Sequence, residues 1–76
     1  MSVEAEVTIA GRVFRLGAVH APRSDGYFRR PRRLLEFDPD GPLPGGRATV
    51  ETVPAGIPHV MAGAEWAAWA GEEVGR

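Results

Sequence analysis

The chain has 76 residues, no cysteine and a formal net charge of −1 at neutral pH. Its length fits one small domain, here taken as residues 1–76, and the lack of cysteine excludes disulfides and thiolate zinc sites. Its sequence carries neither the roughly 20 apolar residues of a membrane-spanning helix nor a secretory signal, which predicts a cytoplasmic protein without a membrane partner.

Two strands joined by a tight turn are predicted first. Residues 3–9 alternate between apolar and polar side chains, as in a half-buried strand. Ala10 and Gly11 then form a turn, and residues 12–20 continue as a second strand. In that strand Phe14, Leu16 and Ala18 face one way. The pattern predicts a β-hairpin, and Gly17 predicts a bulge or bend within its second strand.

A long loop is predicted over residues 21–31. Prolines at both ends and the Ser24-Asp25-Gly26 turn signal interrupt any regular pattern, and Tyr27 and Phe28 are aromatic residues within the segment. Loops of this length are often functional, so the segment is a candidate site.

Two further strands are predicted around a second turn. Residues 32–37 form a short apolar strand, and residues 38–46 are rich in proline, glycine and aspartate, which is typical of a turn region. Residues 47–53 alternate again and predict a strand that ends at Pro54. We therefore expect a hairpin that joins these two strands.

The C-terminal part is expected to contain a short helix. Trp66 and Trp69 are three residues apart within the alanine-rich residues 62–70, so they share one helical face. Gly71 is placed as the residue that follows the helix. A fifth strand over residues 57–61 is an alternative that the pattern leaves open.

Together these elements predict a mostly β fold. We expect a small, strongly curved antiparallel sheet, or an SH3-like partly open barrel, of four to five strands with a short C-terminal helix. The resemblance is one of architecture only. Small barrels of this kind serve many functions, so the predicted fold does not decide what the chain does.

The arginines provide the main functional signal. Seven of the nine lie within residues 12–33 and, with Asp25, give that segment a charge of +6. The predicted binding residues combine guanidinium groups with aromatic rings: Tyr27, Phe28, Arg29, Arg30, Arg32 and Arg33. If the segment is extended, Arg30 and Arg32 point to the side opposite Arg29 and Arg33. A competing interpretation is that these arginines only balance the acids of the same domain.

Catalysis and metal binding are not expected. His20 and His59 lack the residues that would complete a nucleophilic or zinc site, so both are read as structural or surface residues. Glu36, Asp38 and Asp40 could hold a cation in principle, but their spacing indicates a turn. Residues 41–46 are glycine-rich without the Lys-Ser/Thr of a phosphate-binding loop. The sequence predicts a protein that is not an enzyme and that holds no metal or cofactor.

Two functions remain, both of them binding. The first is a protein-interaction or assembly module that docks on a protein partner or on itself through its polarised, arginine-rich surface; size and composition suggest a phage or mobile-element origin. Residues 34–75 carry a charge of −6, so copies could pair head to tail. The alternative is an accessory module that grips the phosphates of DNA or RNA. The overall pI of 6.1 favours the first function. Whether Trp66 and Trp69 belong to the core or to an interface stays open at this stage.

Overall fold

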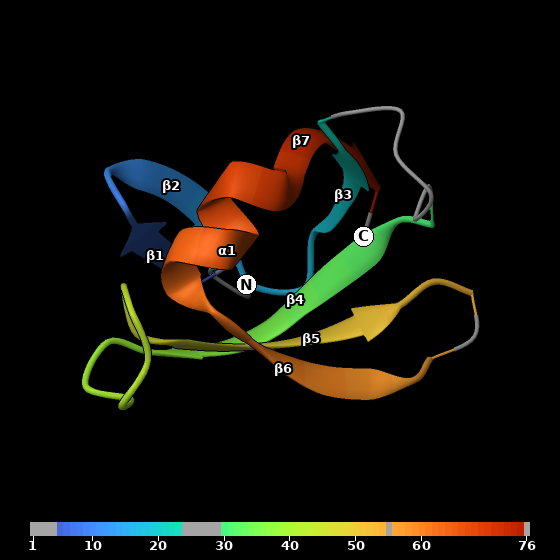
Figure 1. Ribbon diagram of the computed structural model, residues 1–76. Helices are drawn as coiled ribbons and strands as arrows, with labels where there is room; N and C mark the ends of the chain where they lie inside the picture. Colours follow the sequence, from blue (N-terminus) through green and yellow to red (C-terminus); the bar gives the residue numbers. More distant parts are fainter. Residues whose placement is uncertain (1–4, 24–29, 55, 76) are drawn as a thin grey trace.

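The computed structural model describes residues 5–23, 30–54 and 56–75. In chain order these ranges contain strands β1 (Glu6–Ile9), β2 (Arg12–Arg15), β3 (Val19–Pro22), β4 (Arg32–Asp38), β5 (Arg47–Thr52) and β6 (Pro58–Ala62), helix α1 (Gly63–Trp69) and strand β7 (Ala70–Gly75). The predicted mostly β fold with a short helix near the C-terminus is confirmed (Figure 1).

The first two strands form the predicted hairpin. They pair antiparallel with Val7 opposite Phe14, and the turn between them consists of Ala10 and Gly11, with φ angles of 50° and 80°. Two positive φ angles are typical of the two-residue turns whose twist matches that of paired strands. The alternation also holds, since Ile9 is buried and its neighbour Thr8 is exposed.

The prediction of one strand over residues 12–20 is wrong. β2 ends at Arg15, and β3 belongs to the other sheet. Gly17 lies between them with a φ of 88°, in the left-handed region that favours glycine, so the expected bend turns the chain out of the hairpin altogether. Since β3 continues through Ala21 and Pro22, it also includes the first two residues of the predicted loop.

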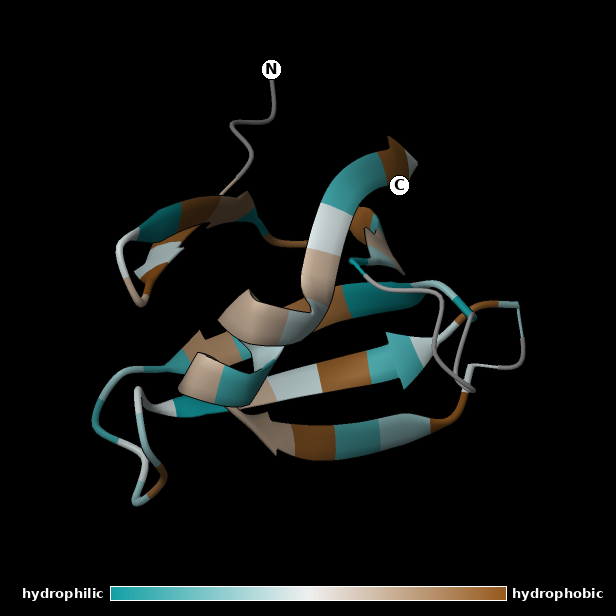
Figure 2. Ribbon diagram, turned by 45° about the horizontal axis from the view of Figure 1, so that its top comes forward, coloured by the Kyte–Doolittle hydropathy of each residue, from teal (hydrophilic) through white to brown (hydrophobic). Residues whose placement is uncertain are grey.

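The second sheet has five antiparallel strands in the order β6-β5-β4-β3-β7. Residues between β4 and β5 form the predicted turn region, in which the backbone N–H of Asp40 donates to the Asp38 carboxylate at 3.0 Å. Along β5, Ala48 and Val50 are buried and alternate with more hydrophilic residues (Figure 2). β3 and β7 turn up from the plane of β4, β5 and β6, so the sheet is strongly curved without closing into a barrel (Figure 1).

Both structures considered for the C-terminal part are present, β6 first and α1 directly after it. Gly71 does not serve as a helix-ending residue, because Ala70 is already extended (φ −70°, ψ 120°) and opens β7. A Cβ on Gly71 would lie 2.8 Å from the carbonyl oxygen of Ala21. The glycine is therefore needed where β7 approaches β3, and the strand was missed because its sequence lacks a regular apolar pattern.

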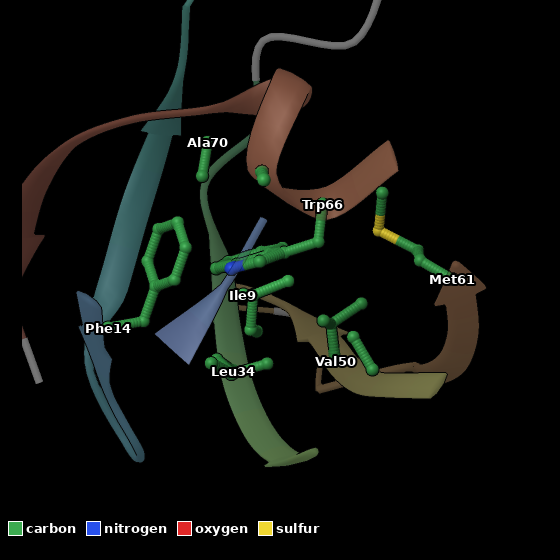
Figure 3. Packing of buried hydrophobic residues seen from close by; sticks show 9 residues of the cluster. Ile9, Phe14, Leu34, Val50, Met61, Trp66 and Ala70 are labelled. Carbon is green, nitrogen blue, oxygen red and sulfur yellow. The ribbon is translucent and has the colours of Figure 1, made fainter. Parts of the chain in front are cut away.

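The core lies between the sheet, the hairpin and α1. Trp66 is fully buried at its centre, surrounded by Ile9, Phe14, Leu34 and Val50 (Figure 3). The rings of Phe14 and Trp66 meet edge to face at 5.6 Å between centroids, a favourable arrangement. The structure thus places Trp66 in the core and Trp69 half-buried at its edge. Among the described residues, no helix has both the length and the apolar character to cross a bilayer.

Candidate arginine surface

Half of the predicted binding set lies within the described residues. Arg30 precedes β4, and Arg32 and Arg33 are its first two residues. Tyr27, Phe28 and Arg29 lie outside the described residues, so their predicted roles stay predictions. The two arginines of β4 point to opposite sides of the sheet, as alternation requires, and have different partners.

Arg32 lies on the helix side of the sheet. Its guanidinium carbon is 4.5 Å from the centre of the Trp69 ring, and its Nη1 lies 3.4 Å from the sulfur of Met61. Partial burial lowers the pKa of Arg32, although a guanidinium remains charged at neutral pH. Trp69 therefore holds in place a cation that has no ion-pair partner among the described residues.

Arg33 lies on the open face of the sheet and is neutralised there. Its Nη1 donates to Glu51 Oε1 at 2.6 Å across the β4–β5 pair, and its Nε donates to the carbonyl oxygen of Gly17 at 3.3 Å. Both members of this ion pair are half-buried. The competing interpretation, that arginines balance acids of the same domain, therefore describes Arg33.

Two arginines of the hairpin are also bound internally. Arg15 pairs with Glu73 of β7. Arg12 donates to the carbonyl oxygens of Ala67 and Ala70, the second at 2.8 Å, and lies over the ring of Phe14. A cation that binds the last carbonyl groups of a helix is favourable there. Both arginines therefore use their guanidinium groups for contacts within the fold.

Within the arginine-rich residues 12–33, three described arginines remain, and we call Arg23, Arg30 and Arg32 the arginine patch. Arg23 and Arg30 are exposed. The backbone N–H of Arg23 donates to the carbonyl oxygen of Trp69 at 2.9 Å, so the backbone of Arg23 and the side chain of Arg32 both contact this tryptophan. Within the described part of the chain no carboxylate lies within ion-pair distance of any of the three. Sequence reasoning missed the role of Trp69, whose only signal was its spacing from Trp66.

The other end of β4 carries opposite charge. Glu36, Phe37 and Asp38 line a pocket of about 230 Å³. Its remaining lining residues are Leu16, Arg47 and Thr49. We call this the acidic pocket. Among the described lining residues Arg47 is the only cation, and its Nη2 lies 3.9 Å from Asp38 Oδ2, the upper limit of an ion pair.

The histidines do not form a site together. His20 is buried beside Phe14 and Trp66, and its Nδ1 lies 2.9 Å from the carbonyl oxygen of Gly71, which places the ring proton on Nδ1. His59 lies on β6, which β5 and β4 separate from β3, the strand that carries His20. Over the described ranges no three His, Asp or Glu side chains are grouped so that they could hold a metal ion.

Comparison with known proteins adds no relative: no family model, no curated protein and no solved structure matches the chain.

Proposed function

We propose that the chain is a non-enzymatic protein-interaction module that docks on an acidic protein surface through the arginine patch. The observation that carries this proposal is the contrast among the arginines. Arg12, Arg15 and Arg33 have partners within the fold, whereas Arg23, Arg30 and Arg32 have no acidic partner among the described residues. An arginine held in one position loses less side-chain entropy when it binds a carboxylate, and Arg32 is held by Trp69.

A nucleic-acid partner has less support. Binding of single strands usually combines basic groups with an aromatic ring that is free to stack on a base. In the arginine patch Arg32 already covers the ring of Trp69, and Trp66 packs against the same side chain at 5.5 Å between centroids. Only three of the described arginines have neither an acidic nor a carbonyl partner for the guanidinium group among the described residues, so few phosphates could be neutralised, and affinity and salt dependence would both be low.

The test is a comparison of two labelled anions by fluorescence anisotropy. The purified chain is titrated into a glutamate-rich peptide and into a mixed-sequence oligonucleotide at about 50 and 200 mM salt, the range in which charge contacts weaken. We expect the peptide to bind at low salt and Arg30→Gln to weaken binding by about fivefold, the effect of one or two charged hydrogen bonds at an exposed site.

Arg47→Gln is the matched control. It removes the same charge from another exposed arginine, which begins β5 opposite Asp38 at the far end of β4, and it should leave peptide binding unchanged. Equal weakening by the two variants would show that only net charge matters and would contradict docking at the arginine patch. Tighter binding of the oligonucleotide than of the peptide would instead support the nucleic-acid alternative.

A further inference from the structure

The two ends of β4 carry opposite charges. The arginine patch lies at its start, and Glu36 and Asp38 lie at its end, followed by Asp40 in the turn. Asp38 follows Arg32 by six positions along the extended strand, a distance of about 20 Å at roughly 3.3 Å per residue. The molecule measures 34 × 30 × 22 Å, so the two charged regions occupy opposite parts of its surface.

The acidic pocket has the chemistry to bind an arginine. Leu16 and Phe37 provide apolar walls that suit the aliphatic stem of a long side chain. Glu36 is exposed, with no ion pair among the described residues, and offers a carboxylate to the guanidinium head. Arg47 offsets only part of this charge, because its contact with Asp38 is long and both side chains are about half exposed, at 50% and 49%.

We propose that the acidic partner is a second copy of this chain, whose acidic pocket receives Arg30 of the first. This proposal rests on the proposed function and identifies the acidic protein on which the chain docks. Arg30 is the candidate that can enter a pocket because it is exposed, whereas Arg32 is half-buried against Trp69 and can offer its guanidinium only at the surface of the patch. The net charge of −1 leaves little general repulsion between copies.

Such an interface joins two different surfaces. A head-to-tail contact of this kind leaves one arginine patch and one acidic pocket free at the ends of every open assembly, so copies continue to add until a ring closes or a filament grows. Association should therefore rise with concentration and fall with salt.

The experiment is sedimentation velocity over a concentration series at about 50 and 200 mM salt. We expect the mean mass to exceed that of the 8.2 kDa monomer at low salt and to return toward it at high salt. Arg30→Gln and Glu36→Gln should each weaken association about tenfold, as expected when one charge of a close pair is removed. Glu65→Gln, which removes an exposed acid of α1, should not.

Mixing the two variants gives the decisive result. The Arg30→Gln chain keeps its acidic pocket and the Glu36→Gln chain keeps its Arg30, so an equimolar mixture should form dimers that cannot extend. A mixture that stays monomeric, with both variants folded by circular dichroism, would overturn the head-to-tail contact, as would a monomeric native chain at low salt. Neither result would affect the proposed docking on other acidic proteins, which the peptide titration tests separately.

Discussion

At the scale of single residues, the same side-chain type has different roles according to its neighbours. Arg33 forms an ion pair with Glu51, Arg32 lies over Trp69, and Arg12 binds carbonyl groups at the end of α1. No charge count over the sequence could separate these roles, because each partner except Glu51 comes from an element more than 25 residues away. An arginine cluster in sequence is thus divided by the fold into structural and exposed members.

Arg12 is expected to contribute measurably to stability. It connects the hairpin to the end of α1 through Ala67 and Ala70, and hydrogen bonds from a charged group contribute about 1.5–3 kcal/mol when partly buried. Arg12→Ala should therefore lower the free energy of unfolding by about 2 kcal/mol in urea titrations. Arg47→Ala, at an exposed position, should change it by less than about 0.5 kcal/mol. Equal effects would contradict a structural role for Arg12.

At the scale of elements, close backbone approach decides where glycine is required. Gly63 begins α1 against the turn before β5, where an added Cβ would lie 2.2 Å from the carbonyl oxygen of Gly45. Gly71 allows β7 to approach β3 in the same way. These contacts fix α1 and β7 on the sheet, and sequence patterns do not report them, because they depend on which distant strand lies alongside.

Gly71→Ala should weaken the pairing of β7 with β3. Its new methyl group would overlap backbone atoms of Ala21 and Pro22, and such overpacking costs about 1–3 kcal/mol. Gly75→Ala is the matched control in the same strand, since nothing lies within 4 Å of its added Cβ. Hydrogen exchange of the β7 amides should accelerate in the first variant and remain unchanged in the second. Unchanged exchange in both variants would contradict this prediction and would show that β7 accommodates the methyl group without losing its pairing with β3.

At the scale of the whole molecule, short-range patterns in the sequence predict single strands and the helix, but not how these elements are arranged. Period-two alternation predicted β1 and β5, a short apolar run predicted β4, and the Trp66–Trp69 spacing predicted α1. The second sheet's order was not predictable, because it depends on the turn at Gly17 and on the pairing of β3 with β7, far apart in sequence. The arginine patch was predicted only in part, since the contacts of Arg23 and Arg32 with Trp69 join segments that are far apart in the sequence.

The two tryptophans should differ in their contributions because they occupy different places in the molecule. Trp66 is fully buried where the hairpin, the sheet and α1 meet, whereas Trp69 is half-buried beside Arg32. Trp66→Ala would lower the free energy of unfolding by about 3–5 kcal/mol, a large part of the roughly 4–11 kcal/mol expected for a domain of this size. The milder Trp66→Phe keeps the fold measurable and should cost about 2 kcal/mol, against under about 1 kcal/mol for Trp69→Phe. Urea titrations followed by far-ultraviolet circular dichroism measure both changes. A larger loss of unfolding free energy for Trp69→Phe than for Trp66→Phe would contradict the central place of Trp66 in the core.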